Sequence, residues 1–219
     1  MRLWLFLKLK RTMDILLSVV MLIVFAPLFA LVAVLIKMDS PGSILFAQNR
    51  VGRGGKLFRI YKFRSMYTHV PSSVATKNLL DSKLCITKIG RVLRKSSIDE
   101  LPQLINVLKG EMSLIGPRPL VPEEREIHEL RRELGAYTVR PGITGLSQVN
   151  GRDIVDAKSK AETDAWYASN ISLWLDVKIV FYSVLCVVTA RGVQEGGETP
   201  SDAPEEETDT RVRSERRRA

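Results

Sequence analysis

The sequence predicts a mixed α/β fold that is mainly helical, with one small β-hairpin and an N-terminal apolar helix long enough for a membrane. Three observations support this prediction: an uncharged apolar run, two short apolar stretches separated by glycines, and several later segments with helix-start and helix-stop signals. The chain divides into a basic flank with the membrane helix (residues 1–38), one main domain (39–193) and a charged tail (194–219).

The apolar run from Ile15 to Ile36 contains no charged residue. As a helix it would be about 30 Å long, which is the thickness of the hydrocarbon core of a bilayer. A signal peptide is disfavoured because the run is too long and no polar cleavage region follows it. The run therefore predicts insertion into a membrane.

The geometry of that insertion has two solutions. Basic residues crowd both flanks, which favours the cytoplasmic side for both ends. They are Arg2, Lys8, Lys10 and Arg11 before the run, and Lys37, Arg50, Arg53, Lys56 and Arg59 after it. Pro27, near the middle, removes a backbone hydrogen bond and kinks the helix. The residues leave open a re-entrant helix, which enters and leaves by one face, and a spanning helix with a tolerated proline.

The segment after the membrane helix has the pattern of a β-hairpin. Residues 39–42, Asp-Ser-Pro-Gly, form a turn signal that ends the helix. The apolar stretches Ile44–Ala47 and Leu57–Phe63 follow, with a glycine-rich segment between them, and this arrangement predicts paired strands. Residues 66–83 are polar and weakly patterned, which indicates a loop or an irregular helix.

An adjacent acid pair, Asp99-Glu100, opens the next predicted helix. Ser97 lies three residues before Glu100, as in a capping box, with Ser97 as the N-cap and Glu100 reaching back to it. Pro102 favours a later start at Asp99, because a proline is tolerated in the first turn. Either start places both carboxylates at the positive end of a helix, which Gly110 ends.

Two further helices are predicted before residue 171. Residues 122–135 are expected to form a solvated surface helix and residues 156–170 another helix, with a turn-rich loop at 140–145 between them. His69 and His128 lack partners at catalytic or metal spacing, and we predict that both are surface residues.

The last part of the chain changes character twice. Residues 172–190 are apolar but interrupted by Asp176 and Lys178, which predicts an interfacial or core helix rather than a membrane span. From residue 194 the tail is charged with few apolar residues, so it is expected to be disordered.

Composition limits the class of partner. The 219 residues include 33 Lys and Arg against 24 Asp and Glu, for a net charge of +9. This surplus fits a soluble domain with a basic surface, or a protein that works beside anionic lipid, nucleic acid or phosphorylated substrate. Nucleic acid is disfavoured because aromatic content is 7% and no stacking platform or groove-reading helix is visible.

Cys85 and Cys186 lie far apart without metal-ligand spacing, which indicates a reducing compartment and no disulfide.

The acid pair lies between two sources of positive charge. A basic stretch precedes Asp99 and Glu100, and Gly116-Pro117-Arg118-Pro119 follows one short helix later. The basic residues are Lys88, Arg91, Arg94 and Lys95. Carboxylates can hold a divalent metal or supply a nucleophile, and the surrounding cations tolerate a polyanionic substrate. The pattern predicts chemistry on phosphates.

A series of motifs extends this pattern over about residues 8–193. In order they are Lys10-Arg11 with Asp14, Gln48–Gly52, Lys62–Met66, Leu93–Leu104 around the acid pair, Gly116–Pro119, Arg140–Gly145 and Gln148–Arg152. With these motifs the chain resembles the bacterial sugar transferases, the small monotopic phosphoglycosyl transferases that load undecaprenyl phosphate. Two positions depart from the family pattern: Ala26 precedes Pro27 where serine is common, and Leu146 stands where an aromatic residue is common.

The resemblance implies a fold, a location and a reaction. It implies a re-entrant membrane helix and a helical domain with a small hairpin, facing the cytoplasm at the bacterial inner membrane. The reaction would move a sugar phosphate from a UDP-sugar to undecaprenyl phosphate with Mg²⁺, as the first membrane step of glycoconjugate assembly. Downstream glycosyltransferases are possible partners.

The family pattern and phosphate chemistry together assign roles to residues. Asp99 is the expected nucleophile, which expels UMP and carries the phosphosugar, and Glu100 assists by holding metal or positioning phosphate, so both are expected metal ligands. Contacts to phosphate or nucleotide are expected from Lys62, Arg94, Pro117, Arg118, Pro119 and Arg152. Arg64 is a further candidate for nucleotide or lipid headgroups. Asp164, in an Asp-x-x-Tyr stretch, is either part of the site or a surface acid.

A second hypothesis is a non-catalytic membrane scaffold that binds anionic lipid through its basic face. The net charge and the apolar run support it. It gives no reason for an acid pair beside Gly-Pro-Arg-Pro, and release of UMP from a UDP-sugar would decide between the two.

Overall fold

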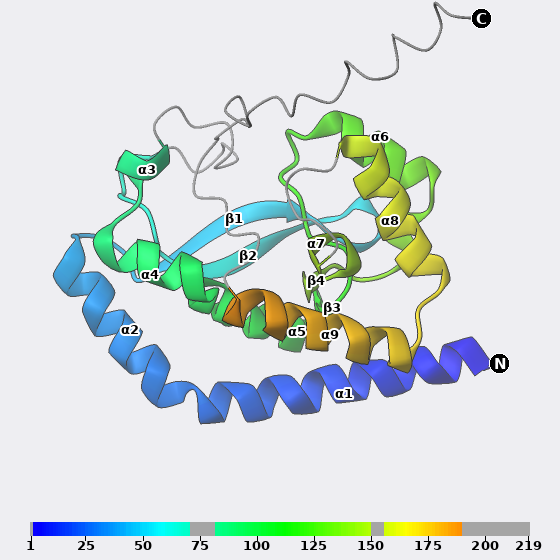
Figure 1. Cartoon of the computed structure of the whole chain (residues 1–219), viewed down its shortest axis with the longest axis horizontal. Coiled ribbons are helices and arrows are strands. Elements are labelled where there is room, and N and C mark those ends of the chain that lie inside the picture. Colours follow the sequence, from blue (N-terminus) through cyan, green and yellow to red (C-terminus); the bar gives the residue numbers. More distant parts are fainter. Residues whose placement is uncertain (1, 71–81, 150–155, 190–219) are drawn as a thin grey trace, which may run out of the picture.

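The computed structural model describes residues 2–70, 82–149 and 156–189. A bent pair of helices runs along two sides of the molecule, and a β-hairpin with shorter helices lies above it (Figure 1). The elements before the acid pair are α1 (Arg2–Val24), α2 (Ala26–Asp39), β1 (Leu45–Val51), β2 (Leu57–Phe63), α3 (Ser82–Cys85) and α4 (Lys88–Ser96). The later ones are α5 (Leu104–Lys109), β3 (Ser113–Ile115), α6 (Arg125–Glu133), β4 (Gly142–Thr144), α7 (Leu146–Val149), α8 (Ala157–Ser169) and α9 (Leu173–Val188). The mainly helical α/β prediction is confirmed, as is the hairpin, whose strands pair antiparallel.

The apolar N-terminal run is a helix pair bent by 60°. Pro27 lies in the first turn of α2, where it cannot donate the backbone hydrogen bond that would continue α1. Among the described helices none alone is long and apolar enough to cross a bilayer, but α1 and α2 together reach that length and composition. Large apolar side chains such as Leu16 and Ile23 are 61% and 69% exposed. The predicted bend is present, and contact with a membrane stays a prediction.

Polar side chains on α1 attach it to the main domain. The Arg11 guanidinium donates to the carbonyl oxygens of Val107 and Leu108 at the end of α5, at 2.7 and 3.2 Å. Asp14 accepts from the Ser113 hydroxyl at 2.7 Å and from the Leu114 amide at 3.2 Å. Because Ser113 and Leu114 belong to β3, α1 is held directly against the strand that leads to Gly-Pro-Arg-Pro.

The end of α2 is held by Arg64. This side chain is only 5% exposed and donates to the carbonyl oxygens of Ile36, Ser40 and Pro41. Arg64 therefore satisfies one carbonyl oxygen in the last turn of α2 and those of the two residues that follow the helix, which is a structural task. The expectation that it contacts nucleotide or lipid headgroups is wrong, because its donors face the inside of the fold.

A second, parallel strand pair was not predicted. β3 and β4 pair in parallel, with Ser113 opposite Gly142. A Cβ atom on Gly142 would lie 2.1 Å from the Gly116 nitrogen, so the two backbones approach closely enough to require glycine. This contact holds the Gly-Pro-Arg-Pro segment against the loop predicted at residues 140–145.

The predicted surface helix at residues 122–135 needs two corrections. α6 lies within the predicted surface helix, but its inner face buries Ile127, His128 and Arg131. The His128 ring bonds to the Tyr137 hydroxyl and to the Val121 carbonyl oxygen, so the prediction that it is a surface residue is wrong. His69 is exposed, as expected. A charged sequence does not reveal which face of a helix packs inward.

The two predicted C-terminal helices are present, and two other predicted segments lie wholly or mostly outside the described residues. α8 and α9 confirm the helices expected over 156–170 and 172–190. α9 packs inward through Ile179 and leaves apolar side chains such as Phe181 exposed. Most of the expected loop at 66–83, together with the charged tail, lies outside the described residues.

Candidate active site

The acid pair lies on a 3₁₀-helix, Ile98–Gln103, that joins α4 to α5. Ser97 ends α4 in the left-handed conformation, with φ 58° and its amide bonded to the Arg94 carbonyl oxygen. It makes no side-chain cap, so the predicted capping box is wrong. The reason is the backbone of Ser97, which is left-handed where it ends α4 and so lacks the extended conformation of an N-cap residue. Gly110 ends α5 with φ 84°, as predicted.

Asp99 is a buried carboxylate in a basic environment. It is 8% exposed. Burial raises the pKa of Asp99 to about 6, and the charge of Glu100 adds to the rise, although Lys62, Arg94 and Arg118 oppose it. Asp99 is therefore ionised at neutral pH while remaining poorly solvated, which is a suitable state for a nucleophile.

Glu100, unlike Asp99, is paired with cations and has a lowered pKa. Its Oε1 accepts from Lys62 Nζ at 2.6 Å and from Arg118 Nη2 at 3.0 Å. Burial alone would raise the pKa of Glu100, but Arg118 and Lys62 outweigh it and hold the pKa far below its usual range. Glu100 therefore stays ionised, cannot act as a proton donor, and fixes two of the predicted phosphate-binding cations beside Asp99.

The Pro117-Arg118-Pro119 segment is held by its three carbonyl oxygens. Pro117 accepts from the Gly142 amide at 3.0 Å, and Pro119 accepts from the Arg50 guanidinium at 3.3 Å. Arg118 accepts from Arg131 Nη1 at 2.9 Å. The backbone under the Arg118 side chain is therefore fixed from three directions, and the prolines act through the main chain.

Arg131 belongs to a buried polar network. It pairs with Asp164 of α8, and each side chain is 1% exposed. Asp164 also accepts from the Ser147 hydroxyl at 2.9 Å. Asp164 is thus a buried partner of Arg131, and the alternative of a surface acid is wrong. The network links α6, α7 and α8 to the main chain of Arg118.

The structure brings most of the predicted site residues together. Asp99, Glu100, Lys62 and Arg118 are in mutual contact or electrostatic range, and Arg94 is close enough to lower the pKa of Asp99. Arg152 lies outside the described residues.

Sequence reasoning missed two arginines of this region, Arg50 and Arg131. Arg50 stands in a motif, Gln48–Gly52, which could have marked it. Arg131 gave no signal of its own, because it lies in a run of charged residues that suggested a solvated face.

The carboxylates suit a metal shared with substrate. No group of three or more metal-binding side chains occurs within residues 2–70, 82–149 and 156–189. Mg²⁺ requires only one or two carboxylates when substrate phosphates and water complete its shell. Among the described residues the Asp99 carboxylate accepts no hydrogen bond, and it lies beside Glu100. The donor set therefore fits an ion that arrives with a diphosphate.

Comparison with known proteins gives a consistent result. The sequence model described as bacterial sugar transferase matches residues 5–190. The chain belongs to the bacterial sugar transferase family. This membership confirms the resemblance drawn from the motifs.

Three similar members of the family have names that state an activity. A UDP-N-acetylgalactosamine-undecaprenyl-phosphate N-acetylgalactosaminephosphotransferase from Aeromonas hydrophila is 47% identical over 193 residues, covering 84% of this bacterial sugar transferase and 45% of the relative. An undecaprenyl-phosphate glucose phosphotransferase from Komagataeibacter xylinus is 44% identical over 187 residues, covering 80% and 35%. An undecaprenyl-phosphate galactose phosphotransferase from Salmonella typhimurium is 42% identical over 201 residues, covering 84% and 41%. The match spans less than half the length of each of these relatives.

Proposed function

We propose that this bacterial sugar transferase moves a sugar phosphate from a UDP-sugar to undecaprenyl phosphate. Similar members of the family carry names for transfer to undecaprenyl phosphate, with N-acetylgalactosamine, glucose or galactose as the sugar. The observation that carries the proposal is the buried Asp99 carboxylate beside Glu100, whose own carboxylate is held by Lys62 and Arg118, and the pKa values of the two acids shift in opposite directions. Asp99 is raised to about 6, and Glu100 is lowered by Lys62 and Arg118.

The proposed reaction has two displacements at one phosphorus atom. An Asp99 oxygen attacks the phosphorus that bears the sugar, a P–O bond forms to the carboxylate, and the P–O bond to UMP breaks. An oxygen of the lipid phosphate then attacks the same phosphorus, and the bond to Asp99 breaks. Both attacking oxygens are already ionised, so neither step requires a general base. The products are UMP and a polyprenyl diphosphate-sugar.

The cations around the acid pair supply electrostatic stabilisation. Lys62 and Arg118 are held at 2.6 and 3.0 Å from one Glu100 oxygen, so their positions are fixed before a substrate binds. Arg94 approaches Asp99 from α4. Mg²⁺, held by Asp99 and Glu100, would neutralise the diphosphate of the donor. A scaffold that only binds lipid would not require this arrangement.

The covalent step can be tested by intact-protein mass spectrometry. The purified chain is mixed with a UDP-sugar and Mg²⁺ without lipid acceptor, using the UDP forms of N-acetylgalactosamine, glucose and galactose in turn. The expected result is an added mass of one sugar phosphate with one of these donors, and release of UMP. Adduct-free protein with every UDP-sugar tried would reject the covalent mechanism.

Activity is expected to fall in acid, because Asp99 must be ionised to attack. With a pKa of about 6, the rate should be level above pH 7 and fall by about tenfold per pH unit well below 6. This fall in rate at low pH, the acid limb of the pH–rate profile, is measured by UMP release in single-turnover experiments without lipid. The lipid phosphate then makes no contribution. A fall in rate centred near pH 4, the ordinary pKa of an aspartate, would show that the pKa of Asp99 is not raised in the active protein.

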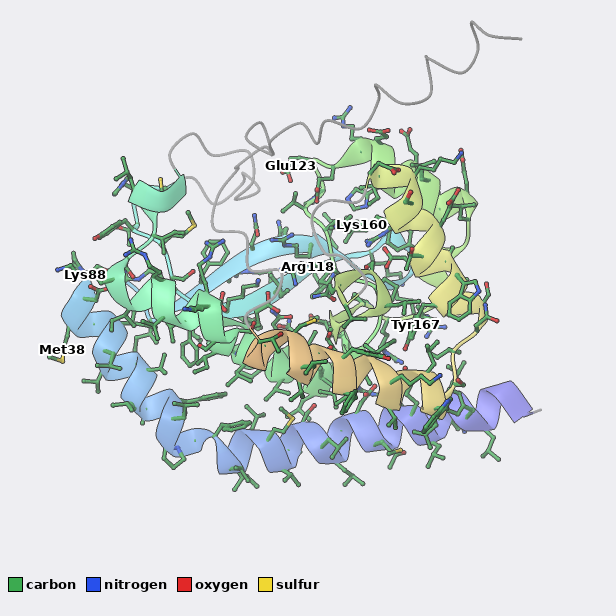
Figure 2. The ribbon with its side chains drawn as sticks, viewed as in Figure 1. Met38, Lys88, Arg118, Glu123, Lys160 and Tyr167 are labelled. Carbon is green, nitrogen blue, oxygen red and sulfur yellow. The ribbon has the colours of Figure 1, made fainter. Side chains whose placement is uncertain are left out.

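We also propose that the bent helix pair is re-entrant and that the domain faces the cytoplasm. The bend of 60° and the exposed apolar side chains of α1 and α2 support this geometry (Figure 2). Accessibility tags fused at Met1 and at Ala219 are both expected on the cytoplasmic side. A tag inserted after residue 40 that is reached from outside would show a spanning helix instead.

A further inference from the structure

Arg50 is a cation of the site that the proposed reaction does not use, although it holds the Pro119 carbonyl oxygen. It projects from β1 and lines a hollow of about 10 Å³, enough for one water molecule, together with Lys62 and Arg118. Its guanidinium donates to Gln48 Oε1 at 2.6 Å and to the Pro119 carbonyl oxygen at 3.3 Å. Among the described residues, its buried Nε has no hydrogen-bond partner. Burial and the neighbouring charge of Arg118 lower the pKa of Arg50 to about 10.

Lys160 is a second cation near Arg118. It lies on the N-terminal half of α8, and Figure 2 shows it and Arg118 between that helix and the hairpin. Burial lowers the pKa of Lys160, and Arg118 is the strongest of its charged neighbours. Within the described part of the chain, the Lys160 ammonium donates no hydrogen bond.

The acids nearby only partly offset these charges. Glu124, Glu100 and Glu123 favour the charged form of Arg50, and Glu124 and Asp164 favour that of Lys160, yet both pKa values remain lowered. Asp164 is already engaged by Arg131 and Ser147. Arg118 therefore places a like charge near both Arg50 and Lys160, and an added anion would stabilise all three cations.

We propose that Arg50 and Lys160, together with Arg118, form a second phosphate subsite, which takes the nucleotide-side phosphate of the donor and of the released UMP. This inference rests on the proposed function. Arg118 joins the two parts of the site, because it also contacts Glu100 beside Asp99. A diphosphate can then place its sugar-bearing phosphorus at Asp99 and its other phosphate between Arg50 and Lys160.

The position of the subsite favours a soluble nucleotide over a lipid phosphate. α1 and α2 run along the lower and left edges of Figure 1, whereas the N-terminal end of α8, where Lys160 lies, is at the far side of the molecule. A phosphate attached to a lipid would approach from the bent helix pair. The nucleotide can enter from the other side.

Binding of UMP to the full chain in detergent, measured by calorimetry, tests the subsite without turnover. Lys160→Met is expected to weaken UMP binding by about tenfold, which corresponds to one charge-assisted hydrogen bond. Lys160→Arg should retain most of the affinity. Lys158→Met is the matched control, because Lys158 is exposed on the same helix, and it should bind UMP like the wild type. Uridine, which lacks phosphate, should bind the wild type and Lys160→Met equally.

The outcomes separate this inference from the proposed function. Equal UMP affinity in Lys160→Met and the wild type, or no UMP binding by the wild type, overturns the subsite even if the protein turns over a UDP-sugar. Loss of UMP affinity in Lys160→Met supports the subsite even if no UDP-sugar is turned over. Absence of turnover would reject only the transfer reaction. Weaker binding of Lys160→Met to vesicles containing undecaprenyl phosphate, with UMP binding unchanged, would assign the phosphate to the lipid and overturn the inference.

Discussion

Replacing Asp99 by asparagine is expected to lower turnover by about 10³-fold or more. The amide is close in size to the carboxylate but cannot form the bond to phosphorus, so neither half of the transfer can proceed through it. The rate of UMP release from the active UDP-sugar, with and without lipid acceptor, measures the loss. The sugar-phosphate adduct on the protein should disappear with it.

The control for Asp99→Asn is Glu133→Gln, which makes a similar acid-to-amide change at an exposed position of α6. Its turnover should equal that of the wild type. Full activity in Asp99→Asn would move the nucleophile to another residue. An adduct that persists in the variant would do the same.

The same substitution is expected to stabilise the fold at neutral pH. The pKa of Asp99 is raised from 3.8 to about 6 in the folded protein, so the folded state favours the protonated form. The carboxyl therefore costs no stability below about pH 4, and the cost grows as pH rises through 6. Asp99→Asn removes an ionisable group that is buried for its chemistry. Its melting temperature should exceed that of the wild type at pH 8 and match it near pH 4, and an equal difference at both pH values would contradict this account.

Sequence reasoning succeeded where the signal is local. The hairpin was visible because two apolar stretches flank a glycine-rich segment, and Gly110 marked the end of α5 because the chain there adopts φ 84°. The acid pair and its cations stood close together in sequence. Each of these features depends on residues a few positions apart.

Sequence reasoning failed where distant segments meet. β3 and β4 are short and far apart, so no alternation revealed their pairing, and only the close approach of Gly116 and Gly142 explains the glycines. The capping box failed because Ser97 also ends α4, which places its backbone in the left-handed conformation instead of the extended one of an N-cap residue. Arg131 and His128 looked like surface residues because a charged helix does not reveal in sequence which face meets α8.

The buried pair of Arg131 and Asp164 is expected to have the largest effect on stability. Asp164→Ala leaves the Arg131 guanidinium, 1% exposed, without its anionic partner and also removes the acceptor of Ser147. Loss of one member of such a pair destabilises a protein by about 3–5 kcal/mol. Chemical unfolding of the detergent-solubilised chain measures the change. Ser147→Ala, which removes only the hydroxyl that donates to the Asp164 carboxylate and keeps the ion pair, should cost less, about 1.5–3 kcal/mol.

A double substitution separates stability from positioning. Arg131→Met with Asp164→Leu replaces both charges by apolar side chains of similar volume, which in other buried pairs has been neutral or stabilising. Stability should therefore recover, but Arg131 can no longer donate to the Arg118 carbonyl oxygen, and the guanidinium beside Glu100 loses its support. Arg118 lowers the pKa of Asp99, so a loosened Arg118 should move the acid limb of UMP release to higher pH. If the double variant is stable and its UMP release falls at the same pH as in the wild type, the network serves the fold alone. If UMP release falls at a higher pH, Arg131 is a positioning residue for the chemistry at Asp99.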